Sequence, residues 1–322
     1  MYRVYIRMYP KGLMIKVAEF YFYRKLPQSK IAQELGLSIS TVSRILAQAM
    51  EEDIIQVTIR DAEKNFNDVG KKLKDIYHLK DVVIIHTPSP KEQHYIKKLL
   101  GKAGSETFLR LARPGNLIGI GAGETILELV ESLTHSSRLF SSSLVPLMGG
   151  WGVGGVAYEV NNLIAMMAGV LRCSYRLLLC PAIVSTAQVR ELFLQEEPIR
   201  RVTELWEQLD VVVFSLGPEV EAGHYPQLLP DKDVVPQMRA LGAVGDVVGR
   251  FLDDKGQEIP SNFRERLITI PIEVLSKVPI RIGLGGGDEK VRSILASLRS
   301  GLVNVLVTDY ETSLRILESN FF

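Results

Sequence analysis

Three glycine-rich segments carry groups with the chemistry to bind an anion or a sugar. The first, GIGAGET, runs from Gly119 to Thr125 and leads into a helical pattern that begins near Glu124. Backbone amides at a helix start attract anions, and the Thr125 hydroxyl adds a hydrogen-bonding group. Because the Glu124 carboxylate repels an anion, this loop is not an unambiguous phosphate site. Its glycines lack the last glycine of the G-x-G-x-x-G pattern, so a dinucleotide site is not predicted.

The other two glycine-rich segments follow later apolar runs. MGGWGVGG spans Met148 to Gly155, and GLGGGDEK places Gly285, Gly286 and Gly287 before Lys290. The Lys290 ammonium is a suitable countercharge for a phosphate or a carboxylate. Any one such loop is equally compatible with a tight strand-to-helix connection, and a lone lysine is usually a solvated surface group. Three of them together favour a binding pocket.

The segment QSKIAQELGLSISTVSRILA, Gln28 to Ala47, has the pattern of a DNA-binding helix-turn-helix. Ile31 and Leu35 form an apolar stripe, and the small Ala32 allows two helices to cross closely. Gly36 supplies the turn, because glycine adopts the left-handed conformation at a helix end without strain. An ordinary helical hairpin is the alternative, but the matching offsets of these residues favour DNA binding.

The second helix of this motif is expected to lie in the major groove of DNA. Ser38 or Ser40 can cap it by accepting a hydrogen bond from a free backbone amide. Arg44 has the chemistry either to read a guanine or to hold a phosphate, and the short hydroxyls around it allow a close approach. The predicted DNA contacts are Gln28, Ser38, Ser40, Thr41, Ser43 and Arg44.

Beyond Lys80 the chain alternates short apolar runs with longer amphipathic ones, which predicts an α/β fold with a mostly parallel sheet. In such sheets ligands bind at the carboxyl ends of the strands, where the three glycine-rich segments would lie. The predicted strands are Asp81 to His86, Leu117 to Gly121, Leu144 to Met148, Tyr175 to Cys180, Asp210 to Gly217, Ile280 to Leu284 and Val303 to Asp309.

The pattern before residue 80 predicts a small module and a connection. An amphipathic helix is expected from Gly12 to Lys25, and Pro27 ends it. After the helix-turn-helix, Ile54, Val57 and Ile59 alternate as in a short strand of a winged variant. The predicted domains are residues 1–60 for DNA binding, 61–80 for a charged linker helix, and 81–322 for effector binding and oligomerisation.

Charge and composition are those of a globular protein with a basic N-terminal part. The net charge of the 322 residues is only +1, but residues 1–60 hold nine Lys and Arg against five Asp and Glu. The remainder has 29 basic and 32 acidic residues, so positive charge coincides with the DNA-binding pattern. Cys173 and Cys180 lie in apolar runs and are expected to be core residues, with no metal site and no cofactor. No apolar stretch resembles a signal peptide or a membrane span, so a cytoplasmic protein without a membrane partner is expected.

Several motifs in order resemble those of the SorC family of sugar-responsive bacterial regulators, and the resemblance covers nearly all of the chain after residue 12. The motifs are TVSRIL (Thr41 to Leu46), IGIGAGETI (Ile118 to Ile126), LMGGWG (Leu147 to Gly152), YRLLLCPA (Tyr175 to Ala182), GAVGD (Gly242 to Asp246) with FLDDKG (Phe251 to Gly256), and GGGDEKVRSILASL with LVTD (Gly285 to Asp309). The resemblance implies a sugar-phosphate isomerase-like effector domain, dimers that associate into tetramers, and control of carbohydrate genes.

The resemblance also implies an effector pocket. Asp246 would accept hydrogen bonds from sugar hydroxyls, and Lys290 would face an anionic group. The implied pocket residues are Gly123, Glu124, Thr125, Met148, Gly149, Gly150, Glu159, Asn161, Asp246, Gly286 and Lys290. The chain departs from the family pattern at Glu124, where relatives usually carry Thr, Ser or Arg, and at Met148, where some place a basic residue. A doubly charged phosphate would therefore have fewer positive partners here. A phosphorylated sugar remains the first expectation for the effector, with an unphosphorylated polyol or another metabolite as the alternative.

Two other classes of protein compete with a regulator. An isomerase-like domain with Asp246 and Lys290 near a sugar has the groups for proton transfer, as in a sugar-phosphate-processing enzyme. None of the five histidines lies in a glycine-rich motif, and an enzyme would leave the N-terminal module unexplained. A metabolite-binding adaptor that recruits proteins instead of DNA is the second rival. The expected protein is a DNA-binding regulator, not an enzyme, with operator DNA of palindromic half-sites and a small sugar as partners.

Overall fold

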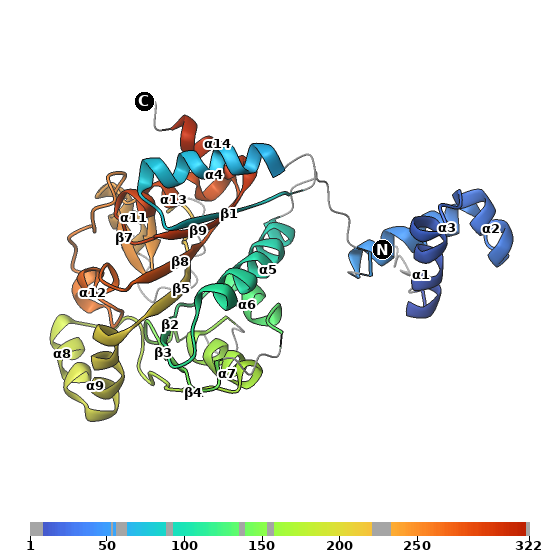
Figure 1. Ribbon diagram of the computed structural model, residues 1–322. Coiled ribbons are helices and arrows are strands. Elements are labelled where there is room, and N and C mark those ends of the chain that lie inside the picture. The colour runs from blue at the N-terminus through green and yellow to red at the C-terminus, as the bar shows by residue number, and fades with distance from the viewer. Residues whose placement is uncertain are drawn as a thin grey trace. The chain divides into compact units, whose positions relative to one another are not determined.

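The computed structural model describes residues 9–52, 54–55, 63–87, 93–134, 139–152, 158–220 and 233–319. The chain divides into two compact units, residues 1–62 and residues 63–322. Each unit is described by itself below (Figure 1).

The small unit is a cluster of helices built around one apolar core. Its elements are α1 (Lys11–Ala18), the π-helix η1 (Glu19–Tyr23), α2 (Gln28–Leu35) and α3 (Ile39–Glu51). The predicted first helix is confirmed as α1 continued by η1. Met14, Val17, Ile31, Val42 and Ile45 are almost completely buried between these helices, because each helix carries its apolar residues on one face.

The large unit contains, within its described residues, a seven-stranded parallel sheet in the order β1-β9-β8-β5-β2-β3-β4. The central strands are mostly apolar, as strands covered on both faces usually are. Their bounds are β1 Asp81–Ile85, β2 Leu117–Ile120, β3 Ser143–Pro146, β4 Ser174–Tyr175, β5 Val211–Ser215, β8 Ile280–Leu284 and β9 Val305–Asp309. Six of the seven predicted strands are confirmed by these elements, with no end displaced by more than two residues.

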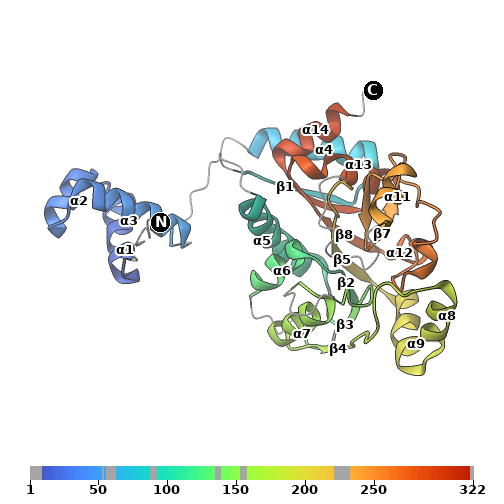
Figure 2. The same ribbon diagram turned by 180° about the vertical axis from the view of Figure 1, so that it is seen from behind.

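Helices cover both faces of the sheet, with α5, α6 and α7 grouped on one side and α4, α13 and α14 on the other (Figures 1 and 2). Their bounds are α4 Glu63–Tyr77, α5 Gln93–Leu111, α6 Glu124–Glu131, α7 Val160–Leu171, α13 Val291–Arg299 and α14 Tyr310–Glu318. The remaining helices are α8 Ala187–Gln195, α9 Glu197–Thr203, η4 Glu204–Gln208, α11 Val234–Ala240, η5 Arg264–Arg266, α12 Ile272–Leu275 and η6 Asp288–Lys290.

Helices α5 and α6 approach closely because glycines stand at their contact. A Cβ added at Gly101 would lie 2.4 Å from Glu128 Cβ and 2.5 Å from the Glu128 backbone carbon. A Cβ at Gly104 would meet Leu284 Cδ2 at 2.3 Å. Glycine at these positions therefore sets how α5 packs on α6 and on the sheet, and with it the place of every α5 side chain.

The predicted strand from Tyr175 to Cys180 is wrong beyond its first residue. β4 ends at Tyr175, and the chain then leaves β3 after one more hydrogen bond, from Arg176 N to Leu144 O (2.9 Å). The Asn161 side chain takes over both backbone groups of Leu178, so they are unavailable to a strand partner. A short apolar run predicted a strand here, but the Asn161 side chain of α7 supplies the hydrogen bonds.

Three further differences concern shorter elements. An antiparallel pair, β6 (Gly245–Val247) and β7 (Arg250–Leu252), was not predicted, because three-residue strands leave almost no periodicity. Ile54 lies in a bend and not in a strand, whereas Val57 and Ile59 are outside the described residues. The helix predicted as a linker, α4, packs against β1 and α14 and so belongs to the large unit.

Candidate DNA-reading helix and effector site

The turn between α2 and α3 is set by two residues. Gly36 ends α2 in the left-handed conformation (φ 63°), as its position in the pattern predicts. Ser38 is the N-cap of α3, and its hydroxyl accepts a hydrogen bond from Thr41 N at 3.1 Å. The same hydroxyl also contacts Thr41 Oγ1 (2.7 Å) and Ser40 Oγ (2.9 Å). Of the two predicted caps, Ser38 is the one that acts.

The outer face of α3 presents short polar side chains and one cation. Ser40, Ser43, Arg44 and Ala47 are exposed, while Val42, Ile45 and Leu46 are buried on the opposite side. Arg44 Nε donates to the Ser40 carbonyl at 3.3 Å, which lays the guanidinium along the helix surface. Of the other predicted contacts, Gln28 and Thr41 are half-buried.

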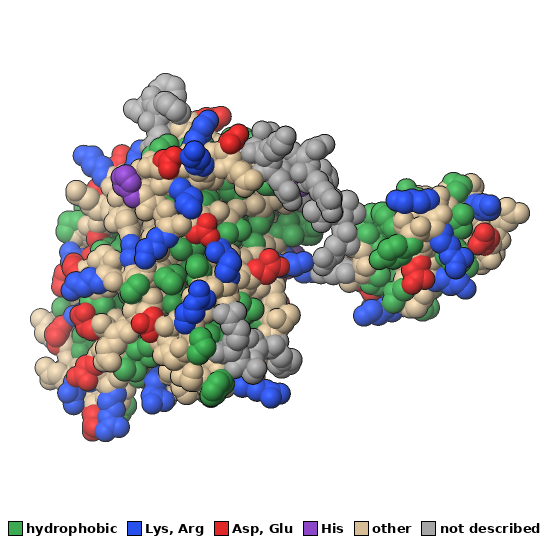
Figure 3. All heavy atoms as spheres, in the orientation of Figure 1, with side chains coloured by type: hydrophobic (Ala, Val, Ile, Leu, Met, Phe, Trp, Pro, Cys, Tyr) green, Lys and Arg blue, Asp and Glu red, His purple; other side chains and the backbone are tan. Residues whose placement is uncertain are grey.

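Positive charge gathers on the small unit. Lys and Arg side chains are visible over the face shown in Figure 3. In the part of this unit that the structure describes, all six basic residues are exposed and outnumber the four acidic ones. The basic residues are Lys11, Lys16, Arg24, Lys25, Lys30 and Arg44. A helix with a free polar face on a basic unit can dock on DNA phosphates and reach base edges.

In the large unit, the candidate effector loops meet at one edge of the sheet. β2, β3, β5 and β8 are parallel, and β5 lies between β8 and β2, so their carboxyl ends lie together. Ser215 Oγ, at the end of β5, donates to the carbonyl of Ala122 in the first glycine loop at 2.8 Å. A Cβ at Gly123 would lie 2.5 Å from that Ser215 Oγ, so the close approach requires glycine.

Glu124 forms an ion pair with Lys97 of α5. Lys97 is a candidate site residue that the sequence did not predict, because it precedes Glu124 by 27 residues and nothing distinguishes it from Lys98 beside it. Because the Lys97 ammonium offsets the charge of the Glu124 carboxylate, Glu124 repels an anionic ligand less strongly. It also adds a second cation to this edge of the sheet.

Lys290 is a buried cation at the same edge. Its ammonium donates to the carbonyl of Leu216 at 2.7 Å, directly after β5. Burial, followed by the positive charge of Lys97, lowers the pKa of Lys290 to about 8, and the nearby acidic groups, Asp246 first, oppose this shift. Lys97 and Asp246 thus each lie close enough to act on Lys290, although the three residues come from distant parts of the chain.

Asp246 is held in a tight hairpin between β6 and β7. Its Oδ2 accepts a hydrogen bond from Gly249 N at 2.7 Å, and its backbone carbonyl accepts one from Gly217 N at 3.2 Å. Both central residues of the turn, Val248 (φ 52°) and Gly249 (φ 78°), have positive φ. The residue is 9% exposed, so the hairpin places a fixed carboxylate beside the end of β5.

The second glycine loop is fixed by backbone contacts. A Cβ at Gly149 would lie 2.5 Å from the carbonyl oxygens of Cys180 and Pro181, and Gly150 N donates to Cys180 O at 2.9 Å. Glu159, the N-cap of α7, accepts a hydrogen bond from Trp151 N at 2.9 Å. Burial raises the pKa of Glu159, while the backbone hydrogen bonds act against that rise.

Some predicted pocket residues make structural contacts. Asn161 donates to Leu178 O and accepts from Leu178 N, both at 3.1 Å. Met148 and Thr125 are almost completely buried. In the third loop, the Gly287 amide is taken by Asp309 Oδ2 at 2.8 Å, and a Cβ at Gly286 would meet that same oxygen at 2.4 Å.

The geometry can therefore orient a polyhydroxylated anion but offers no nucleophile with an adjacent base among the residues discussed above. Lys290 and Lys97 supply positive charge, and Asp246 and Glu159 supply acceptors for hydroxyl groups.

Among the helices of the described residues, none has the length and hydropathy needed to cross a bilayer.

Comparison with known proteins identifies both units. Residues 61–318 match the family described as "Putative sugar-binding domain", and residues 16–52 match the family "Sigma-70, region 4". The sorbitol operon regulator of Klebsiella pneumoniae is 28% identical over 309 residues, 95% of this chain and 98% of that protein. The transcriptional regulator LsrR of Escherichia coli K12 is 27% identical over 308 residues, 94% of each chain.

Solved structures agree with these sequence matches. The full-length sorbitol operon regulator SorC from Klebsiella pneumoniae superposes with a TM-score of 0.75 at 26% identity, covering 97% of this chain and 100% of that one. A transcriptional regulator from Streptococcus pneumoniae gives a TM-score of 0.76 at 26% identity, over 81% of this chain and 99% of that one.

A helix-turn-helix unit joined to a sugar-binding α/β domain defines a class of protein, the DNA-binding transcriptional regulator whose DNA affinity depends on a small effector. The chain belongs to the SorC family of sugar-responsive bacterial transcriptional regulators.

Proposed function

We propose that the chain regulates carbohydrate genes by binding an operator through α3 and a phosphorylated sugar at the carboxyl edge of its parallel sheet. The observation that carries the effector class is the buried Lys290, which lies close to Lys97 and Asp246. An ammonium buried to this degree is costly unless an anion or several acceptors face it. A phosphate at this edge would contact both cations.

Thermal unfolding of the full chain against a panel of sugar phosphates and their unphosphorylated counterparts tests the effector class. A phosphorylated member should raise the melting temperature of the protein. Its counterpart without phosphate should need at least a tenfold higher concentration for the same rise. Lys290→Ala and Lys97→Ala should each weaken that stabilisation. Full stabilisation retained in Lys290→Ala would refute the anion site, and a stronger effect of an unphosphorylated polyol would favour the alternative effector class.

For the DNA-reading role, Arg44→Ala should weaken operator binding and reduce its dependence on salt by about one released counterion, since Arg44 is a cation on the exposed face of α3. Arg200→Ala is the matched control, because it removes an exposed arginine of α9 in the large unit. Unchanged affinity and salt dependence in Arg44→Ala would mean that another surface binds DNA.

The proposed mechanism is a shift between arrangements of subunits. The effector contacts loops from several strand ends, so its binding can favour one arrangement and alter the spacing of paired α3 helices. A dimer or tetramer on palindromic half-sites would make DNA affinity sensitive to such a change. We also propose that the protein is cytoplasmic and is not an enzyme. Turnover of a sugar by the unaltered protein, lost in Asp246→Asn, would contradict the absence of catalysis.

A further inference from the structure

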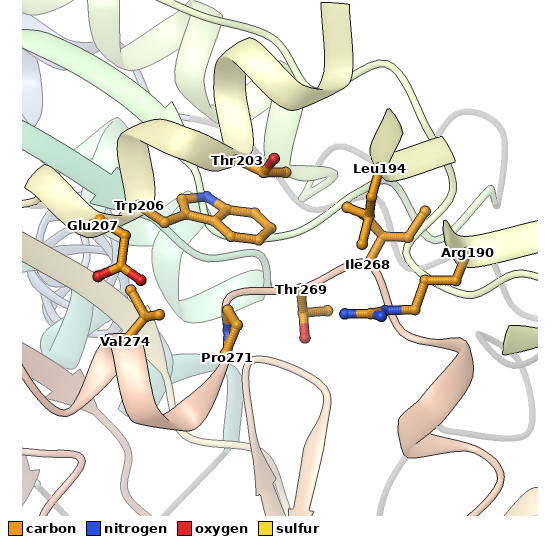
Figure 4. Close-up of a pocket in the computed structure, with 9 residues that line it drawn as sticks. All are labelled: Arg190, Leu194, Thr203, Trp206, Glu207, Ile268, Thr269, Pro271 and Val274. Atoms are coloured by element: carbon orange, nitrogen blue, oxygen red, sulfur yellow. The ribbon is translucent and has the colours of Figure 1, made fainter. Parts of the chain in front are cut away.

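Among the side chains that line the pocket in Figure 4, those best suited to bind a small molecule are already bonded or buried. The Arg190 guanidinium donates to Leu267 O at 2.7 Å and pairs with Glu191. Thr269 is 1% exposed and Trp206 is 5% exposed. These groups are not free to recognise a partner, whereas the first residue of α3 in the small unit is presented to the solvent.

That first residue, Ile39, is an exposed apolar side chain on the helix that we propose to read DNA. It is 55% exposed, whereas Val42 and Ile45 of the same helix are completely buried in the core of the small unit. Core packing thus does not account for an isoleucine at this position. Single exposed apolar residues are ordinary on protein surfaces, so only the position of Ile39 on the helix gives it significance.

The position of Ile39 is one at which a helix-turn-helix meets the bases. The second helix of this motif contacts base edges through its N-terminal residues. Side chains on a helix tilt toward its N-terminus, so Ile39 extends from the leading end of α3. Ser43 and Ala47 follow on the same face at intervals of four residues, and both are small and exposed. They allow the helix to approach the floor of the major groove closely, which brings its first residue to the base edges.

The polar groups around Ile39 hold the start of the helix in place. Ser38 Oγ accepts a hydrogen bond from Thr41 N at 3.1 Å and lies 2.7 Å from Thr41 Oγ1. It also lies 2.9 Å from Ser40 Oγ, and Arg44 Nε donates to Ser40 O at 3.3 Å. These contacts fix the backbone on either side of Ile39, so its side chain is presented in a defined direction.

The chemistry of an isoleucine side chain selects one base. Thymine alone among the four bases carries a methyl group in the major groove, and apolar side chains make contact with it. The edges of the other bases present donors and acceptors there, and an apolar side chain would remove these from water without replacing their hydrogen bonds. Burying one methyl group corresponds to about a fourfold gain in affinity.

We propose that Ile39 is a specificity-determining residue that recognises the methyl group of a thymine in each operator half-site. The inference rests on the proposed operator binding by α3 and adds the base that this residue reads. Ser38, Ser40 and Thr41 support the start of the helix, and Arg44 supplies positive charge.

Selection of duplexes from a randomised DNA pool by the full chain supplies the probe. Each thymine of the enriched sequence is then replaced by uracil, which keeps the base pairing and removes only the methyl group. At one position in each half-site the replacement should weaken binding about fourfold, and replacement in both half-sites about fifteenfold. Uracil replacements that leave the affinity unchanged at every position would overturn the proposal.

Ile39→Ala assigns the contact to this residue. The variant should bind the thymine and uracil duplexes with nearly equal affinity, because the apolar group that faces the methyl is removed. Alanine is favourable in a helix, so α3 should be retained, and thermal unfolding checks this. Ile15→Ala is the matched control, since it removes an isoleucine that is 40% exposed on α1 and lies outside the reading helix. That control should keep the fourfold discrimination.

Two results separate this inference from the proposed function. If the chain enriches no sequence from the pool, both operator binding and base reading by Ile39 are refuted. If it enriches a sequence but Ile39→Ala discriminates against uracil as strongly as the unaltered chain does, operator binding stands and only the role of Ile39 is refuted.

Discussion

Lys290 shows how burial can make a cation responsive to pH. Desolvation lowers its pKa from 10.5 to about 8, so the folded protein holds this proton less firmly than the unfolded chain. Between about pH 8 and 10.5 the unfolded state binds more protons, and the contribution of this group to stability rises with pH. The protonated form that can bind an anion is half populated at about pH 8 and approaches completion only well below that pH.

We therefore expect affinity for an anionic effector to fall as the pH rises above about 8, with a limiting slope of about tenfold per pH unit. A phosphate monoester is already mostly dianionic above pH 7, so its own titration does not produce this fall. Calorimetric titration across this range measures the slope. Lys290→Met should bind weakly with no such slope, and a slope retained in that variant would assign the titration to another group.

The position of Asn161 in its motif implies contact with a ligand, whereas its hydrogen bonds indicate that it supports the backbone at Leu178. Replacement by Ala leaves the N–H and C=O of Leu178 without their partners and should lower the free energy of unfolding by about 2 kcal/mol. Effector affinity should change less than threefold, because both side-chain groups already hydrogen-bond to the backbone of Leu178. Urea unfolding and effector titration measure the two effects, and a large loss of affinity at unchanged stability would restore the ligand role.

At the scale of elements, the candidate site depends on how closely α5 lies on α6. α5 carries Lys97 and α6 begins with Glu124, so the ion pair between them exists only at this separation. The glycines of α5 that face α6 and the sheet thus act on the site without touching a ligand.

Gly101→Ala should destabilise the large unit by about 1–3 kcal/mol, because the added Cβ would lie 2.5 Å from the backbone of Glu128. Gly169→Ala is a matched control in the exposed face of α7, where nothing lies within 4 Å of the added Cβ. That substitution should stabilise by about 0.5–1 kcal/mol. Chemical denaturation measures both, and equal effects of the two variants would show that α5 and α6 can separate at no cost.

At the scale of the whole molecule, the two compact units have separate apolar cores. Multidomain chains of this kind need not unfold in a single two-state transition. A ligand that binds one unit stabilises that unit by mass action and leaves a separately unfolding unit unchanged.

Differential scanning calorimetry should accordingly resolve a transition for each unit. An effector at 100 times its dissociation constant should stabilise the large unit by about 2.7 kcal/mol, while operator DNA should shift the transition of the small unit. If the effector shifted both transitions equally, the two units would unfold as one cooperative body.

The features that the sequence alone determined are local. The helix-turn-helix depends on Gly36, Ser38 and apolar spacings within twenty residues, and most strands of the sheet appear as continuous apolar runs. The structure decided what depends on distant contacts, such as the pairing of Lys97 with Glu124, 27 residues apart, and of Lys290 with Leu216, 74 residues apart. It also assigned Asn161 to support of the backbone. Pattern along the chain reports which face of an element is buried, whereas only the packed sheet brings charges from separate elements within range of one another.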